Sequence, residues 1–299
     1  MDSSQRAFCT AQSAASDPGD FDDSGLPAEP AALARLVRGL VIHREEAADR
    51  YGVELAADRK AAAAETRYAD EILALDRERS GGEPLAKAPR PPADRFAGTC
   101  RDFALLHCAL LRHTGTPARI RCGFGTYFMP GFHDDHWVTE WWDEARGWTL
   151  TDPQVLPDEA AAWQWELDFD PYDVPRDRFL VGGDAWRRCR TGRADPATFG
   201  VSVVNLTGLP EVQCNVVKDL AALNGVEVLP WDGWGLADAD LELVGPADYA
   251  LLDAAAAAGA EGDFVAARRL YAENEGLRVP RTITSHTTYT GERLVTLRP

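Results

Sequence analysis

The sequence predicts an α+β fold, and three observations support this. Residues 33–41 place apolar side chains at helical spacing, and the segment over residues 98–112 leads into a second, almost wholly apolar helix. Residues 118–124 instead alternate apolar and polar side chains with a period of two. Segments 136–142 and 148–152, rich in aromatic and β-branched residues, are separated by a short turn. We therefore expect helices together with an antiparallel hairpin.

The first 28 residues are expected to form a disordered tail, because they are rich in Asp, Ser, Ala and Gly and offer little to bury. After the helix at 33–41, an Ala-rich helical segment is predicted over residues 56–79. The sequence Ser80-Gly-Gly-Glu-Pro ends it, and a proline-rich connection over residues 87–92 follows.

The segment that carries Cys100 holds the first candidate functional residue. Gly98-Thr-Cys-Arg-Asp predicts a turn that leads into a helix, and Gly115 provides its end. Unpaired backbone N–H groups and the helix dipole favour a thiolate in the first helical turn. The helix is apolar almost all round and should be buried. Cys100 is therefore a candidate nucleophile on a rigid support.

The hairpin supplies two candidate partners for this thiol. If Trp142 pairs with Trp148 across the turn, Val138 lies opposite Asp152, and His136 and Asp152 become diagonal neighbours on one face. A histidine oriented by an aspartate, with a thiol elsewhere in the fold, is the layout of cysteine-nucleophile catalysis. The imidazole takes the thiol proton, the carboxylate fixes the tautomer, and the thiolate attacks a carbonyl to form a thioester.

Four pieces of sequence then carry a family resemblance: Gly98-Thr-Cys-Arg-Asp-Phe-Ala, Gly115-Thr-Pro-Ala-Arg, Asp135-His-Trp, and Gly147-Trp through Asp152-Pro. In this order and spacing, over residues 95–155, the chain resembles the core of the transglutaminase-like superfamily. The resemblance implies a papain-like architecture, in which a central helix bearing the cysteine packs on an antiparallel sheet. It also implies Cys100 as nucleophile, His136 as base and Asp152 as orienting group.

The predicted organisation has three parts. A disordered tail over residues 1–28 precedes a transglutaminase-like catalytic domain over residues 29–200, with its own N-terminal helices. Residues 201–299 form a C-terminal α/β extension packed on the core, either as part of the same domain or as an addition to it. In this half we expect a strand at 201–206, a helix at 216–223, an extended piece at 226–231, a helical pair over 246–275 and β-like structure from 282.

Composition excludes several classes of function. The formal net charge is −17 and no block of basic residues occurs, so nucleic acid and anionic membranes are not expected partners. No apolar run suits a membrane span or a signal peptide, and a cytoplasmic location is expected. The six scattered cysteines do not resemble a disulfide framework or a zinc site, and we expect no cofactor and no metal.

Other polar residues near the motifs have simpler interpretations. The His133-Asp-Asp-His136 run is a less favoured metal site, because it lies in a loop and His136 has a competing role. Asp134 or Asp135 could replace Asp152 as the orienting group. Arg119 and Arg121 could hold a carboxylate or phosphate, although strand arginines usually form a salt-bridged face.

Several more side chains are best explained by packing. Cys108 and Cys122 occupy apolar positions, and His107 and His113 are expected to be ordinary helix residues. The tryptophans are most simply part of the core, although they could also form the wall of an acyl-binding site.

The favoured function is cysteine-dependent acyl transfer through a thioester, most simply amide-bond formation in biosynthesis. The expected partners are a small or carrier-bound acyl substrate and an amine acceptor. The same residues would also serve an amide or peptide hydrolase. There are two further alternatives. One is a Dieckmann-type carbon–carbon cyclase, which needs a site that excludes water, and the other is a non-catalytic binding module on the same fold. No oxyanion donor other than the Cys100 backbone N–H can be identified from the sequence.

Overall fold

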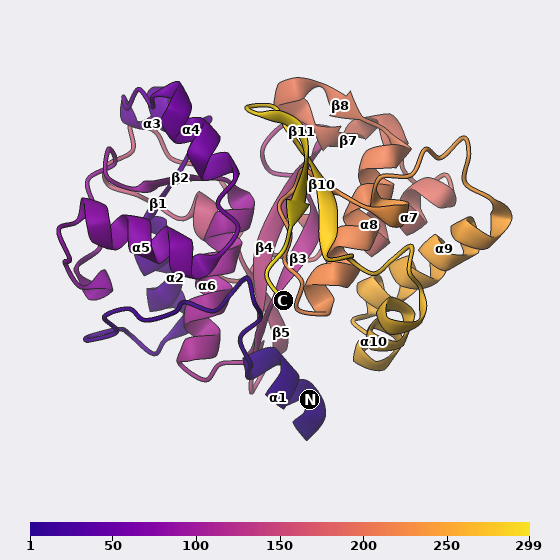
Figure 1. The fold of residues 1–299 in the computed structure, drawn as a ribbon, viewed down its shortest axis with the longest axis horizontal. Coiled ribbons are helices and arrows are strands. Elements are labelled where there is room, and N and C mark those ends of the chain that lie inside the picture. The colour runs from indigo at the N-terminus through magenta and orange to yellow at the C-terminus, as the bar shows by residue number, and fades with distance from the viewer. The chain divides into compact units, whose positions relative to one another are not determined.

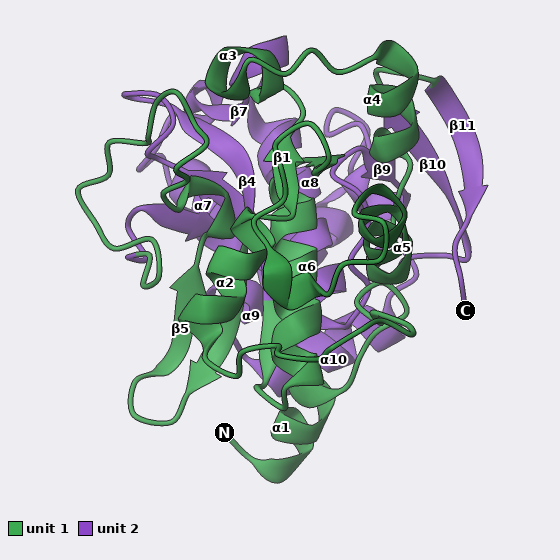
Figure 2. Cartoon of the chain, turned by 90° about the vertical axis from the view of Figure 1, so that its left-hand side faces the viewer, with its two compact units in different colours: residues 1–119, 138–174, 288–290 green, residues 120–137, 175–287, 291–299 purple.

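The computed structural model describes residues 1–299, which divide into two compact units (Figures 1 and 2). Unit 1 comprises residues 1–119, 138–174 and 288–290, and unit 2 comprises residues 120–137, 175–287 and 291–299. The predicted boundary at residue 200 is therefore not where the units separate. The chain instead passes from one unit to the other within β3 (Ala118–Gly125) and β4 (His133–Asp143), and again between residues 174 and 175.

Unit 1 is organised around the helix α6 (Cys100–His113), whose residues 100–112 are all buried. In Figure 2, α2 and α5 flank α6, and both pack against it, as α1 does. The helices that precede α6 are α1 (Ser3–Thr10), α2 (Pro30–Arg38), α3 (Ala47–Tyr51), α4 (Ala57–Ala64) and α5 (Ala69–Arg79). The predicted helix over residues 56–79 is thus divided into α4 and α5.

The apolar stripe at residues 33–41 does not end as expected. The helix α2 stops at Arg38, and Gly39 packs closely on Pro89: a Cβ at Gly39 would lie 2.7 Å from the Cα of Pro89. The next residues form the strand β1 (Val41–His43), which pairs in parallel with β2 (Phe96–Gly98). A distant strand therefore decides the conformation of a segment whose local pattern suits a helix.

The N-terminal segment contains a helix and buried residues, whereas a disordered tail was expected there. Asp2 caps α1, since its side chain accepts a hydrogen bond from the Gln5 N–H at 2.8 Å. Cys9 is buried, and buried Ser16 accepts a hydrogen bond from Nη1 of Arg112 at 2.7 Å. A polar composition predicts disorder only when no partner satisfies the polar groups, and here α6 supplies that partner.

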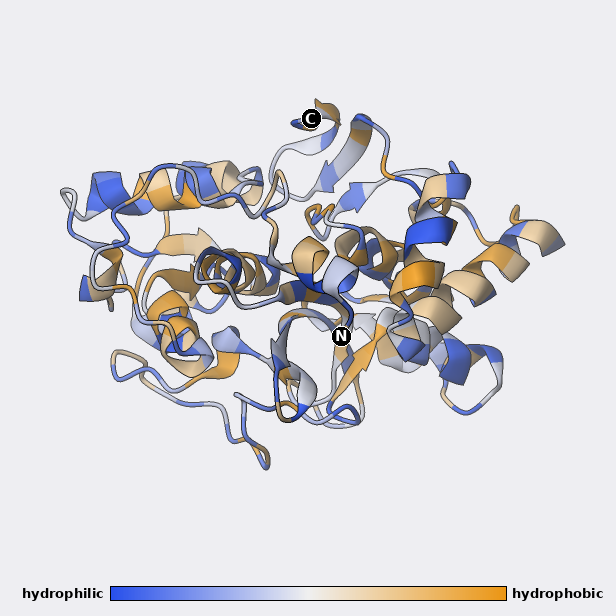
Figure 3. Cartoon of the chain, turned by 90° about the horizontal axis from the view of Figure 1, so that it is seen from below, coloured by the Kyte–Doolittle hydropathy of each residue, from blue (hydrophilic) through white to orange (hydrophobic).

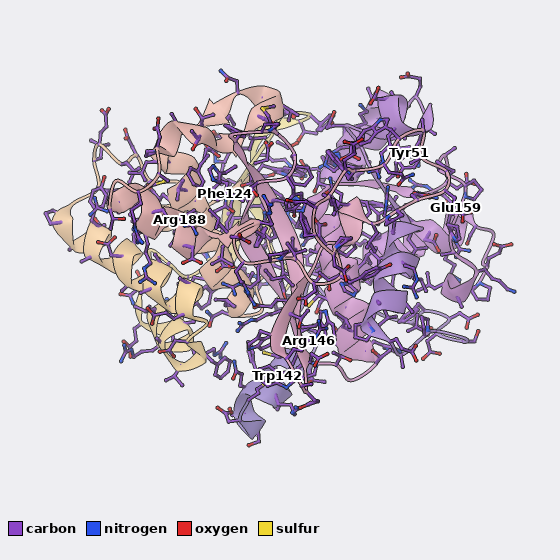
Figure 4. All side chains as sticks on the ribbon, turned by 180° about the vertical axis from the view of Figure 1, so that it is seen from behind. Tyr51, Phe124, Trp142, Arg146, Glu159 and Arg188 are labelled. Carbon is purple, nitrogen blue, oxygen red and sulfur yellow. The ribbon has the colours of Figure 1, made fainter.

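The main sheet has the strand order β6-β3-β4-β7-β8, with β5 (Gly147–Thr151) paired to β4. In unit 1 the β4–β5 register places Trp142 opposite Trp148 and continues to Thr139 opposite Thr151, which confirms the predicted hairpin pairing. The two indole rings meet edge to face at 5.6 Å. Figure 4 shows Trp142 and Arg146 together at the turn end of this hairpin.

Unit 2 contains four helices that pack on one another (Figure 1). They are α7 (Gly182–Arg190), α8 (Leu209–Leu223), α9 (Pro246–Glu261) and α10 (Phe264–Glu273). The pair α9 and α10 matches the predicted helical pair, whereas α7 lies in a stretch with no clear pattern and α8 begins before the predicted residue 216. Many helices in Figure 3 carry both orange and blue segments, as expected for helices with one buried and one exposed face.

The strands of unit 2 complete the sheet and add a smaller one. β6 (Phe179–Val181) pairs with β3, β7 (Phe199–Val201) pairs in parallel with the start of β4, and β8 (Leu206–Thr207) pairs with β7. The second sheet holds β9 (Asp232–Gly233), β10 (Thr282–Thr287) and β11 (Gly291–Thr296). The 3-10 turns are η1 (Leu85–Lys87), η2 (Pro153–Val155), η3 (Pro196–Thr198), η4 (Ser202–Val204) and η5 (Gly235–Ala237). No helix of the chain combines the length and the apolar character that crossing a membrane requires.

The two arginines of β3 are held in buried ion pairs. In unit 1, Nε of Arg119 donates to Oε2 of Glu140 at 2.6 Å, and its guanidinium lies 3.9 Å from the ring centroid of Trp148. In unit 2, Arg121 donates to both carboxylate oxygens of Asp219, at 2.9 and 2.8 Å. Of the two interpretations of these arginines, the structure favours the salt-bridged one.

Replacing Asp219 by alanine should strongly destabilise the protein. The carboxylate also accepts the backbone N–H of Cys122 at 3.0 Å, so its loss leaves the buried charge of Arg121 without its counter-ion and this N–H without its acceptor. We expect the free energy of unfolding to fall by about 3–5 kcal/mol, measured by urea denaturation. D173A, which removes the exposed partner of Arg146, is the matched control and should have little effect. Equal losses in the two variants would contradict this prediction.

His107 is a second buried group with a consequence for stability. It lies on α6 with no exposed surface, and Nε2 is 3.1 Å from the carbonyl oxygen of Pro30. Burial lowers the pKa of His107 to about 4. The ring therefore stays neutral in the folded chain below the pH at which an unfolded histidine is protonated.

His107 should make the protein sensitive to acid between about pH 6.5 and pH 4. In this range the unfolded chain binds a proton at this residue and the folded chain does not, so stability falls as the pH falls. We expect this residue alone to lower the free energy of unfolding by about 2 kcal/mol from pH 7 to pH 5. H107Q keeps a donor for Pro30 but cannot titrate. The same pH dependence in H107Q and in the wild-type protein would rule out this explanation.

Candidate active site

Cys100 is the first residue of α6, as predicted. Thr99 precedes it in an extended conformation, and the backbone N–H of Thr99 donates to Oδ2 of Asp102 at 2.9 Å. The threonine and Asp102 form a capping box, which fixes the point at which the helix begins. The position of the thiol therefore follows from the local sequence.

The residue two before Cys100 must be a glycine. A Cβ at Gly98 would lie 2.9 Å from both Cβ and Oδ2 of Asp102, and 3.0 Å from Cγ1 of Val41. Any side chain there would push the end of β2 away from the first turn of α6. The Cys100 side chain lies in this tightly packed turn, with 9% of the residue exposed.

Asp152 also belongs to unit 1 and is fully buried. It follows β5 and caps η2, where its Oδ1 accepts the backbone N–H of Gln154 at 3.0 Å. The turn η2 packs against α6, so Cys100 and Asp152 lie on elements that are in contact. Pro153 comes directly after Asp152 and ends the strand, because it has no N–H for the ladder.

His136 lies in unit 2, on the part of β4 that precedes residue 138. It is 2% exposed and surrounded by aromatic rings, with centroid distances of 4.7 Å to Phe128, 5.9 Å to Tyr127 and 6.3 Å to Phe179. Of the three predicted residues, unit 1 therefore contains Cys100 and Asp152. The grouping of His136 with them stays a prediction.

The two aspartates next to His136 have contacts of their own within unit 2. Oδ2 of Asp135 accepts a hydrogen bond from Nδ2 of Asn215 at 2.5 Å, and burial raises the pKa of this carboxyl group. Oδ1 of Asp134 accepts the backbone N–H of Ser202 at 2.9 Å. Both carboxylates thus help to pack β4 against neighbouring segments, which makes Asp152 the better candidate for the orienting role.

His133 likewise has a packing role. Its ring stacks on Phe199 with a centroid distance of 4.0 Å, and Nδ1 is 3.2 Å from the carbonyl oxygen of Thr198. Burial lowers the pKa of His133. No group of three or more His, Cys, Asp or Glu side chains in residues 1–299 could hold a metal ion.

A cluster that the sequence patterns did not reveal lies near the start of α6, within unit 1. Glu46 is its centre: Oε1 accepts a hydrogen bond from Nε2 of Gln154 at 2.9 Å and lies 3.7 Å from Nδ1 of His43. Oε2 accepts a hydrogen bond from Nη1 of Arg50 at 2.9 Å. The local sequence gives no indication of this cluster. The β1–β2 pairing that brings His43 to this place joins segments far apart in the chain.

The six cysteines are all free, and they differ in their surroundings. Cys108 and Cys122 have no exposed surface, as expected for core residues. Burial raises the pKa of the Cys122 thiol well above its ordinary value, and burial also raises that of Cys189 to about 11. These thiols are poor nucleophiles at neutral pH.

Cys100 should react with iodoacetamide faster than the other buried cysteines. The helix terminus favours its thiolate, whereas the raised pKa of Cys122 keeps that thiol protonated. We expect the alkylation rate of Cys100 to reach its plateau below pH 8, followed by peptide mass spectrometry over a pH series. C100A identifies the modified peptide. Alkylation of Cys100 no faster than that of Cys108 and Cys122 would contradict its role as nucleophile.

Comparison with known proteins adds two findings. No curated protein matches the chain. Among solved structures, a candidate cysteine protease from Cytophaga hutchinsonii is similar at 18% sequence identity, over 60% of this chain and 46% of that one, with a TM-score of 0.25. The aligned part is thus less than half of the length of that protein, and a likeness at this level supports no conclusion about fold or function.

The family comparison covers the segment that holds Cys100 and Asp152. The model of the transglutaminase-like superfamily matches residues 52–153, from the loop before α4 to the start of η2. It supports a cysteine-dependent enzyme in general terms. The matched segment contains the capped start of α6, β3, β4 and β5, which are the elements that carry the resemblance. Over this third of its length, the chain is similar to the transglutaminase-like superfamily.

Proposed function

We propose that this protein is a cysteine-dependent acyltransferase that works through a thioester and forms an amide bond. Cys100 is the nucleophile, His136 the base and Asp152 the group that orients the imidazole. The observation that carries the proposal is the position of Cys100 at the capped start of α6, on which the Asp152 turn packs.

The connectivity of β4 supports the role of His136. The β4–β5 ladder ends with Thr139 opposite Thr151, and the same register continued by one residue would bring Val138 opposite Asp152. His136 lies two residues before Val138 on the same strand, and alternate residues of a strand share a face. The aromatic surroundings of the imidazole, Phe128 among them, would hold its orientation.

The proposed reaction has two halves. The Cys100 thiol gives its proton to His136, and the thiolate attacks the carbonyl carbon of the acyl donor. The leaving group departs with a proton, which leaves an acyl-Cys100 thioester. An amine then attacks this carbonyl and gives up one proton to a base, the C–N bond forms, the C–S bond breaks, and the thiolate is restored.

The donor is proposed to be a small or carrier-bound acyl compound, and the acceptor an amine. Hydrolysis by the same residues is the second candidate, because water and an amine attack a thioester in the same way. The acidic composition of the chain, with 48 Asp and Glu against 31 Lys and Arg, is compatible with a cationic acceptor such as a protonated amine.

Incubation with cell extract should leave an acyl group on Cys100. We expect mass spectrometry to find one added acyl mass on the peptide that contains Cys100, and none in C100A. The trapped acyl-protein, mixed with an excess of a primary amine, should yield the amide. Release of only the free acid under amine excess would identify a hydrolase instead, and the absence of any adduct would contradict acyl transfer.

The partner residues are tested in the same assay. H136A should lower the rate of acylation about 10²–10⁴-fold, because the thiol loses its base. D152N should lower it less, since the ring remains but loses its orienting charge. C122A serves as the control, because Cys122 lies in the core and should not affect the rate.

A further inference from the structure

His43 lies next to the strand that leads into Cys100. In the parallel β1–β2 pair, His43 is the partner of Gly98, and the N–H of Arg44 donates to the carbonyl oxygen of Gly98 at 2.9 Å. Both strands pack against α6 (Figure 2). Neighbouring strands lie about 4.8 Å apart, so His43 is close to the residue two before the nucleophile.

The glycine at position 98 shows which face of the β1–β2 pair the histidine occupies. A Cβ there would meet Asp102 of the first turn of α6 and Val41 of β1. That face is therefore the one on which α6 begins. Side chains at i and i+2 of a strand share a face, so His43 lies on the same face as Val41. Both Cys100 and His43 thus belong to the region around the start of α6.

The carboxylate of Glu46 lies beside the imidazole of His43. The N–H of Glu46 donates to the carbonyl oxygen of His43 at 3.0 Å, which folds the turn so that Oε1 lies 3.7 Å from Nδ1. The Arg50 guanidinium donates a hydrogen bond to the other oxygen of this carboxylate at 2.9 Å. At this distance the contact is electrostatic rather than a hydrogen bond, and it favours the ring orientation in which Nδ1 faces Glu46.

The same carboxylate reaches the turn of Asp152. Oε1 of Glu46 also accepts from Nε2 of Gln154, whose backbone N–H donates to Asp152. The His43 and Glu46 side chains are only 20% and 16% exposed, so they are ordered but still open to solvent.

We propose that His43, oriented by Glu46, is a second base that takes the proton from the amine attacking acyl-Cys100. The amine nitrogen attacks the thioester carbonyl, the C–N bond forms, the C–S bond breaks to restore the thiolate, and the amine proton passes to Nε2 of His43. Water later removes it from the imidazolium. This inference rests on the proposed acyl transfer, and it names the residue that would act on the amine acceptor in the same site.

The two halves of the reaction can be measured separately. With p-nitrophenyl acetate as donor, the burst of p-nitrophenolate reports acetylation of Cys100. The acetylated protein is then mixed with benzylamine, and the loss of the acetyl mass reports aminolysis. H43Q and H43A should leave the burst rate unchanged and lower the aminolysis rate about 10²-fold. E46Q should give a smaller loss in the same step.

Two readouts separate this role from a structural one. Added imidazole should restore aminolysis in H43A, where it can replace the missing base, and should not do so in E46Q. The matched control is H113A, which removes another histidine–carboxylate pair of unit 1: His113 lies at the far end of α6, 3.1 Å from Asp23. It should change neither step.

The outcomes are distinct. Normal acetylation with aminolysis lowered in the His43 variants supports the proposal. Normal acetylation with wild-type aminolysis in H43Q and H43A overturns it and leaves the proposed function intact. Loss of acetylation in H43Q and E46Q alike would show a role before the acceptor step and also overturns it. Failure of the wild-type protein to form acetyl-Cys100 overturns both proposals.

Discussion

The capped start of α6 is the constraint on which the rest of the candidate site depends. Asp102 accepts the N–H of Thr99, and Gly98 leaves room for that carboxylate, so the helix can begin only at Cys100. The remainder of α6 is buried and cannot shift without loss of its packing. A thiol in this place is both positioned and exposed to the positive end of the helix dipole.

Buried ion pairs explain how an acidic chain can keep arginines inside its strands. Arg119 and Arg121 alternate along β3, and each has a carboxylate partner, Glu140 in unit 1 and Asp219 in unit 2. Removal from water is costly for each charge, and only close, well-oriented pairing offsets that cost. The excess of acidic residues supplies these partners from β4 and from α8.

The Glu46 cluster shows how secondary contacts join distant segments around the nucleophile. One carboxylate contacts His43, Arg50 and Gln154, of which the last lies directly beside Asp152. The cluster therefore links the strand next to Cys100 with the turn of its proposed partner. Both ends belong to unit 1.

The sequence by itself determined the parts of the protein that depend on local patterns. The capping residues before α6, the alternation in β3 and the turn between Trp142 and Trp148 act over a few residues, and each leaves a visible pattern. Cys100 and the hairpin that carries Asp152 could be predicted for this reason. The superfamily match over residues 52–153 follows the same segment.

Only the tertiary structure decided the elements that depend on distant partners. Val41 to His43 form a strand because β2 lies beside them, and the polar segment after α1 is ordered because Ser16 accepts a hydrogen bond from Arg112. The division into two units and the place of His43 beside Gly98 arise from pairings across many residues. Such pairings are selected by packing and hydrogen-bond satisfaction in the whole fold, which no short stretch of sequence encodes.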